Sequence, residues 1–191
     1  MELAEAREIL IAALNEHAIL RGEFTLKSGA RSTWFIDAKR AICRHPVLAA
    51  TAILTLDRLD PQVTAIGGLT MGADPIAFAA AALAQASGRP LRAFSVRKEA
   101  KGYGQGGRIA GSLEPDDLAC VVEDTPSRGT SLLAAVEAVR AEGARVIQAL
   151  AVVDRGGTAA RVVDPLPFTP LLTAPDLGLP YEGGLANSRF S

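Results

Sequence analysis

An acidic pair followed by a hydroxyl-rich turn is the segment of the sequence best suited to chemistry. Glu123 and Asp124 follow the apolar run of residues 119–122, which is typical of a buried strand. The turn that comes next carries hydroxyl groups, a glycine and one cation, at Thr125, Pro126, Ser127, Arg128, Gly129, Thr130 and Ser131. Such a turn can direct backbone N–H groups, hydroxyls and a helix N-terminus at one anion. The carboxylates suit sugar hydroxyls or a metal-bridged diol, so the segment predicts a ribose 5-phosphate site. The alternative is an acidic pair that only caps a helix on a solvated loop.

A second candidate is a cationic, glycine-rich loop. Arg97, Lys98 and Lys101 place three positive charges within five residues, Tyr103 follows them, and residues 97–111 contain five glycines. Glycine adds conformational freedom, and a loop of this kind can close over a multiply charged anion and exclude water. The alternative is a solvated surface loop, which is what most charged runs are.

A third candidate is the glycine-containing stretch 67–74, which includes Thr70, Met71 and Gly72. Exposed N–H groups and a closely approaching backbone would suit a pyrophosphate there. The alternative is an ordinary glycine turn between a strand and a helix.

Residues 24–37 form a candidate hood over such a ligand. Two short strands joined by a turn are predicted, with Lys27 as a charge for an acidic base and Trp34 or Phe35 as a stacking surface. The alternative is a hairpin that packs both aromatic residues into the core. Arg155, just past a later strand, could pair with a carboxylate through its planar guanidinium.

The elements that would position these segments alternate between strand and helix. Hydrophobic spacing predicts helices at residues 3–20, 46–59 and 131–141 and one that begins at Pro75; the predicted strands are residues 24–26, 33–37, 63–66, 91–96, 121–123 and 146–153. This order predicts an α/β protein with a mostly parallel sheet and helices on both faces. Ligands then bind at the carboxyl ends of the strands, where the candidate loops lie. The proline-rich residues 165–180 are expected to be irregular and docked on the domain.

Composition narrows the class of protein. A chain of 191 residues with 49% hydrophobic residues predicts a single globular domain, residues 1–191. The net charge of −1 gives no global field that would attract nucleic acid. Cys43 and Cys120 lie far apart and fit no metal spacing, which favours a reducing cytoplasm. We expect no membrane partner, because the sequence has neither a signal peptide nor an apolar run long enough to span a bilayer.

Three of these segments together resemble orotate phosphoribosyltransferases, a type I phosphoribosyltransferase family. They are Phe-Thr-Leu-Lys-Ser-Gly at residues 24–29, Arg-Lys-Glu-Ala-Lys at residues 97–101 and Val-Val-Glu-Asp at residues 121–124. The first two are much more specific to the orotate enzymes than the third, which many phosphoribosyltransferases share. The Val-Asp-Arg that ends at Arg155 also matches the family's orotate-contacting arginine. The resemblance runs from about Gly22 to Arg155 in the right order.

The resemblance implies the type I fold with a hood at about residues 20–40. It implies transfer of ribose 5-phosphate from phosphoribosyl pyrophosphate (PRPP) to orotate, with Mg²⁺ held mainly through PRPP and water and not by a protein metal site. It also implies a homodimer in which the cationic loop reaches the partner's active site. Lys101 and Asp124 are the expected catalytic residues. PRPP contacts are expected from Arg97, Lys98, Lys101, Tyr103, Glu123, Asp124, Thr125, Pro126, Ser127, Arg128, Gly129, Thr130, Ser131, Thr70, Met71 and Gly72, and orotate contacts from Lys27, Trp34, Phe35, Ser127 and Arg155.

The chain departs from the family pattern at three of these positions. Tyr103 follows the loop where a histidine is usual, Arg128 replaces a small residue in the turn, and Gly72 replaces a lysine that some members carry. Two other functions stay open from the sequence. One is a phosphoribosyltransferase for another base, and the other is a non-catalytic PRPP-sensing regulator that binds nucleic acid.

Overall fold

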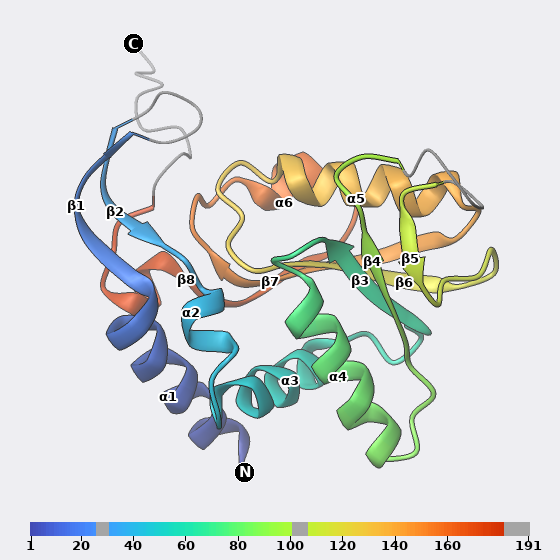
Figure 1. Ribbon diagram of the computed structural model, residues 1–191, viewed down its shortest axis with the longest axis horizontal. Coiled ribbons are helices and arrows are strands. Elements are labelled where there is room, and N and C mark those ends of the chain that lie inside the picture. Colours follow the sequence, from blue (N-terminus) through green and yellow to red (C-terminus); the bar gives the residue numbers. More distant parts are fainter. Residues whose placement is uncertain (26–30, 101–106, 182–191) are drawn as a thin grey trace.

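A computed structural model describes residues 1–25, 31–100 and 107–181 of the chain. Its centre is a six-stranded sheet in the order β5-β4-β3-β6-β7-β8 (Figure 1). The strands are β3 (Ala65–Leu69), β4 (Arg92–Val96), β5 (Ile109–Gly111), β6 (Leu118–Glu123), β7 (Arg145–Asp154) and β8 (Phe168–Thr173). All neighbouring pairs are parallel except β4 and β5. The predicted α/β class with a mostly parallel sheet is confirmed.

Helices cover both faces of the sheet, so that each face closes its own apolar core. Figure 1 shows α1 (Leu3–Ala13), α3 (Val47–Arg58) and α4 (Asp74–Ala86) on one side, with α5 (Thr130–Ala141) and α6 (Ala159–Val163) on the other. The strands β6 and β7 are buried along nearly their whole length, as near-continuous apolar runs in parallel sheets are. No helix of the described ranges is both long and apolar enough to cross a membrane.

The central strand β3 has glycine at two adjacent positions. A side chain at Gly67 would collide with the backbone and ring of Phe94 on β4, and one at Gly68 would collide with the Val122 carbonyl on β6. The absence of a side chain therefore lets three neighbouring strands approach closely at the end of the sheet that carries the site.

The hood is a two-stranded antiparallel hairpin, β1 (Ile19–Thr25) and β2 (Arg31–Ile36), followed by the short helix α2 (Lys39–Ile42). Along β2 every second residue is buried, so Trp34 faces inward and Phe35 outward. The predicted hairpin is confirmed, but the turn that carries Lys27 lies outside the described residues.

Three element predictions were wrong. The helix expected over residues 3–20 is an α-helix only as far as Ala13, and a π-helical turn (Leu14–Ala18) follows it. Strand β1 then begins at Ile19, because residues from Ile19 onward pair with β2. The segment 97–111 contains the short antiparallel strand β5. The tail that was expected to be irregular contains strand β8 and then the 3₁₀ helix η2 (Ala174–Leu177). Strand β8 accommodates Pro170 because β8 lies at an edge of the sheet.

Candidate active site at the carboxyl ends of the strands

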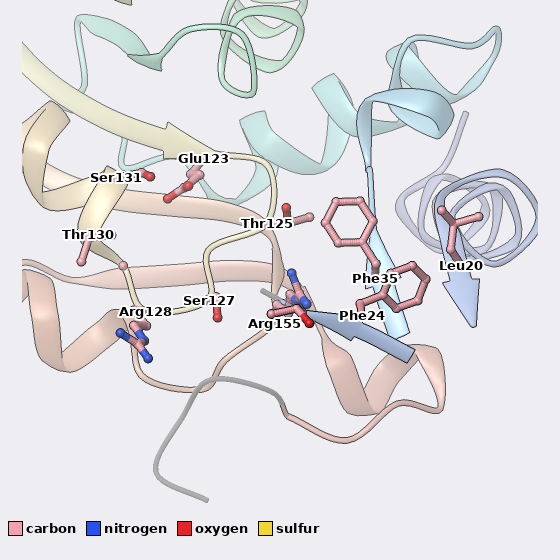
Figure 2. Close-up of a pocket in the computed structure, with 12 residues that line it drawn as sticks. Leu20, Phe24, Phe35, Glu123, Thr125, Ser127, Arg128, Thr130, Ser131 and Arg155 are labelled. Atoms are coloured by element: carbon pink, nitrogen blue, oxygen red, sulfur yellow. The ribbon is translucent and has the colours of Figure 1, made fainter. Parts of the chain in front are cut away.

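A cavity of about 810 Å³ lies between the hood and the carboxyl ends of β6 and β7. It is lined by Leu20, Phe24, Thr25, Phe35, Glu123, Thr125, Ser127, Arg128, Gly129, Thr130, Ser131 and Arg155. Strand β4 lies on one side of β3, whereas β6 and then β7 lie on its other side. The strand order therefore reverses between β3 and β6, and the cavity adjoins this topological switch point. In Figure 2 the acidic and hydroxyl groups lie at one end of the cavity and the aromatic rings at the other, with Arg155 between them.

The turn before α5 presents the N-terminus of this helix to the cavity. Gly129 precedes the helix with a left-handed backbone (φ 79°) and has no side chain to cap it, whereas Glu123 at the end of β6 accepts a hydrogen bond from the Leu132 N–H. N–H groups of the first helical turn have no partner within their own helix, and together with the helix dipole they favour an anion. Thr130 and Ser131 on this turn line the cavity. The predicted arrangement of turn and helix is confirmed, whereas the binding of a phosphate there stays a prediction.

The loop between β7 and α6 supports this turn from behind. The Arg155 N–H donates to the Pro126 carbonyl (3.0 Å), and the Thr158 hydroxyl donates to the Ser127 carbonyl (3.1 Å). Gly156 packs so closely on the Ser127 backbone that any side chain would collide with it. Sequence reasoning missed this support, because the two loops meet only in the folded sheet.

Glu123 ends β6 and has an unusual protonation equilibrium. Burial and the neighbouring Asp124 charge raise its pKa from 4.5 to about 7, although hydrogen bonds from the Ser131 side chain and the Leu132 backbone lower it in part. The second carboxylate oxygen, Oε2, is buried without a hydrogen-bond partner among the described residues. Because Glu123 accepts hydrogen bonds from α5, the alternative that the acidic pair caps a helix is partly right. The carboxylate is half-buried and lines a cavity, however, so it does not lie on a solvated loop.

Asp124 is held by two groups that come from different parts of the chain. Its Oδ1 accepts a hydrogen bond from the Thr125 N–H (2.9 Å), and its Oδ2 lies 3.1 Å from Nζ of Lys39 on α2. The residue is only 8% exposed. Nothing in the sequence pattern pointed to Lys39, because 85 residues separate it from Asp124.

The aromatic end of the cavity comes from the hood and β7. Phe35 (37% exposed) lines it together with Phe24, whose ring centroid is 5.9 Å away. The Arg155 guanidinium, on a residue 6% exposed, lies 4.9 Å from the Trp34 ring centroid and 5.7 Å from that of Phe35. Arg155 therefore has its orientation set by aromatic faces before any ligand arrives.

Trp34 does not lie on the cavity wall, and its expected role as a stacking surface is corrected. Its side chain is 1% exposed and belongs to the core, because alternation along β2 sends Trp34 and Phe35 to opposite faces. The open alternative, two aromatics packed in the core, holds for Trp34 and not for Phe35. Trp34 contacts the site through the Arg155 guanidinium.

The loop between β3 and α4 lies beside Asp124. A Cβ at Gly72 would lie 2.7 Å from Asp124 Oδ1, so a side chain there would displace the Asp124 carboxylate. The Thr70 hydroxyl and the Ser95 hydroxyl each donate to Asp74 at 2.7 Å, which ties the loop to β4. The Thr70–Met71 peptide bond is cis, and Met71 is 70% exposed. The structure thus brings this candidate loop next to the acidic pair, although its residues do not line the cavity.

The cationic candidates that the structure describes, Arg97 and Lys98, do not line the cavity. Arg97 donates from Nη1 to the Ile109 carbonyl on β5 (3.0 Å), and Lys98 is exposed to solvent. Lys27, Lys101 and Tyr103 lie outside the described residues. Among the residues that line the cavity, the positive charges are those of Arg128 and Arg155. The described ranges hold no group of three or more His, Cys, Asp or Glu side chains placed to bind a metal ion.

These features define the class of the protein. A mostly parallel sheet with helices on both faces, a hood before it, and an acidic pair with a hydroxyl-rich turn at the end of β6 make the type I phosphoribosyltransferase fold.

Comparison with known proteins defines the family. No family model matches the chain. The chain is 41% identical over 184 residues to the orotate phosphoribosyltransferase of Corynebacterium glutamicum, covering 92% of this chain and 96% of that protein. The crystal structure of Mycobacterium tuberculosis H37Rv orotate phosphoribosyltransferase in complex with Fe(III) dicitrate is similar with a TM-score of 0.78 and 36% identity, over 91% of this chain and 99% of that one. The structure of that enzyme with PRPP gives a TM-score of 0.74 and 35% identity, over 91% and 99%. The chain belongs to the orotate phosphoribosyltransferase family.

Proposed function

We propose that this protein transfers ribose 5-phosphate from PRPP to orotate, giving orotidine 5′-monophosphate and pyrophosphate in pyrimidine biosynthesis. The observation that carries the proposal is a cavity with two chemically different ends. One end offers the Glu123 carboxylate, hydroxyls and a helix N-terminus, and the other offers an aromatic face and a buried guanidinium. A reaction that joins a phosphorylated sugar to a flat, acidic base needs both ends in one space.

The roles of the groups follow from their positions. The turn from Thr125 and the start of α5 receive the 5-phosphate, and Glu123 and Asp124 receive the ribose hydroxyls. Phe35 stacks on the orotate ring, and Arg155 pairs with its carboxylate through a bidentate contact. Ser127 lies between the two ends, within reach of the base.

The chemistry exchanges one bond at C1 of the ribose for another. The bond from C1 to the pyrophosphate oxygen breaks, the bond from C1 to the orotate nitrogen forms, and the nitrogen loses its proton. Positive charge develops on the sugar while negative charge leaves on pyrophosphate, so orientation and cations at the leaving group lower the barrier. We assign the cations to Lys101, Lys98 and Arg97, and the contact near the reacting nitrogen to Asp124.

Mg²⁺ is the expected metal. This ion keeps several waters and binds through one or two carboxylates plus substrate phosphates. The neighbouring carboxylates of Glu123 and Asp124 fit that mode, since they would hold the ribose diol while the ion would be held mainly by PRPP and water. When bound, the ion would neutralise charge on the pyrophosphate.

We further propose a homodimer with shared active sites, in the cytoplasm. Arg97, the first cation after β4, donates to the Ile109 carbonyl on β5 and does not line the cavity of its own chain, which fits a loop that serves a second subunit. An apolar surface for that contact is available on α4 and the loop before it, where Phe78 is 48% and Met71 70% exposed. Both cysteines are free, which fits a reducing compartment.

The direct test is an absorbance assay. Protein, PRPP, Mg²⁺ and orotate are mixed, and the loss of orotate absorbance is followed with and without the metal. Adenine, hypoxanthine and uracil are offered in parallel, and salt-dependent binding of RNA or DNA is measured separately. Turnover of another base without orotate turnover would refute the proposal in favour of a different phosphoribosyltransferase. Binding of nucleic acid without any turnover would favour the regulator.

A further inference from the structure

Lys39 connects the hood to the acidic pair. It is the first residue of α2, three residues after the last residue of β2, and its Nζ lies 2.8 Å from Asp37 Oδ1 and 3.1 Å from Asp124 Oδ2. The Lys39 side chain is 40% exposed, whereas that of Asp124 is 12% exposed. One ammonium group thus joins a carboxylate of the hood segment to a carboxylate at the end of β6.

Asp124 needs such a partner because its carboxylate is largely removed from water and adjoins another acid. A buried carboxylate that remains ionised requires a counter-charge and hydrogen bonds. Within the described ranges, the cation that forms an ion pair with Asp124 is Lys39. Burial opposes the charge of the Lys39 ammonium, but hydrogen bonds and charges from Asp37 and Asp124 outweigh it and raise its pKa. The cation is therefore present across the neutral range.

The short helix α2 carries two adjacent cations. Lys39 and Arg40 both lie within its four residues. Arg40 is exposed, and the ion pair to Asp124 among the described residues comes from Lys39 and not from Arg40. The two neighbours therefore separate the effect of charge on α2 from the effect of contact with Asp124.

We propose that Lys39 is a positioning residue for the reaction: it holds the Asp124 carboxylate in the orientation that receives the ribose hydroxyls of PRPP. This inference rests on the proposed function. Lys39 fixes Oδ2 while the Thr125 N–H fixes Oδ1, so rotation of the carboxylate is blocked at both oxygens. Each oxygen keeps a lone pair for a ribose hydroxyl. Because Lys39 follows directly from the hood, the sugar subsite depends on the hood that closes the base subsite.

The test measures PRPP affinity by calorimetry with Mg²⁺ and without orotate, in Lys39→Met, Lys39→Arg and the matched control Arg40→Met. Loss of a hydrogen bond to a charged group should raise the dissociation constant of PRPP about tenfold or more in Lys39→Met. Lys39→Arg should restore it to within about threefold of the wild type, and Arg40→Met should leave it unchanged. Circular dichroism and thermal unfolding report the fold of each variant, and Lys39→Gln is a second neutral variant should Lys39→Met not fold.

A double-mutant cycle decides whether Lys39 acts through Asp124 or touches PRPP itself. If Lys39 acts through Asp124, adding Lys39→Met to Asp124→Asn should cost no further affinity. Independent, multiplying losses would overturn the inference, as would equal PRPP affinity in Lys39→Met and the wild type. A wild-type chain that binds no PRPP would instead refute the proposed function, so the two failures are distinguishable.

Discussion

Replacing Glu123 by Gln should make the protein more stable at alkaline pH and worse at binding PRPP. Burial and the charge of Asp124 raise the pKa of this carboxyl from 4.5 to about 7 in the folded protein. The folded protein therefore holds the proton more tightly than the unfolded chain does. Between these two pKa values the unfolded chain loses its proton first, so stability falls as the pH rises. Glutamine cannot ionise and escapes this loss, and its amide oxygen can still accept from Ser131 and Leu132.

The size of the gain follows from the same two pKa values. The difference between 4.5 and about 7 amounts to a gain of about 3 kcal/mol at pH 8, about 2 kcal/mol at pH 6 and under about 0.5 kcal/mol at pH 4.5. The gain is complete above the folded pKa and vanishes below the unfolded one. The ionised carboxylate is thus kept at the expense of stability, which is expected where it has a ligand to bind.

Urea unfolding at pH 4.5, 6 and 8 measures this gain, and calorimetry with PRPP and Mg²⁺ measures its functional cost. Glu137→Gln, an exposed position on α5, is the matched control and should change stability by under about 0.5 kcal/mol at every pH. A gain that is equal at pH 4.5 and pH 8, or a loss at pH 8, would show that burial does not govern the protonation of Glu123. Unchanged PRPP affinity would remove Glu123 from the ribose site.

Three further outcomes are expected. Gly156→Ala places a methyl group against the Ser127 backbone, so it should displace the phosphate-binding turn and raise the KM for PRPP at least about tenfold. Gly178→Ala, strained by its left-handed backbone (φ 70°) but distant from the turn, should lower stability without changing this KM; equal kinetics in the two variants would show that the loop does not support the turn. Phe35→Ala should weaken orotate binding and leave the unfolding midpoint almost unchanged, whereas Trp34→Ala should lower stability by about 3–5 kcal/mol, and the reverse pattern would contradict the assignment of the two faces of β2. Lys101→Ala should lower kcat on the order of 10²-fold or more. A mixture of inactive Lys101→Ala and inactive Asp124→Asn proteins should regain activity, because a hybrid dimer with shared sites has one site without either defect. No recovery after verified subunit exchange would place the loop in its own subunit's site.

The parts of the site that could be predicted are those encoded within a few residues. The strand, acidic pair, turn and helix from residue 118 to residue 141 are contiguous, and each carries its own signal: a buried apolar run, a hydroxyl-rich turn and helical spacing. The hood was also predictable as a hairpin. Which of its aromatic residues faces the ligand was not, because Trp34 and Phe35 are adjacent and only the packing of β2 against the core decides between them.

The parts that could not be predicted depend on contacts between distant segments. Lys39 gives no local signal, since its importance comes from an aspartate 85 residues away. The support of Pro126 and Ser127 by the loop after β7 has the same origin. β8 was missed because Pro170 reads as a strand breaker, and only its edge position in the sheet removes that objection.

The paired glycines of β3 also bear on the order in which the molecule folds. Glycine has low strand propensity and loses the most backbone entropy on ordering, so Gly67 and Gly68 give β3 little intrinsic tendency to form. Both of its pairings are parallel, to β4 and β6, and close only after intervening helices have formed. The geometric centre of the sheet should then be among the last parts to consolidate, with φ-values near zero. The Gly72 loop, which follows β3, would reach Asp124 at the end of β6 only when the two halves of the sheet join.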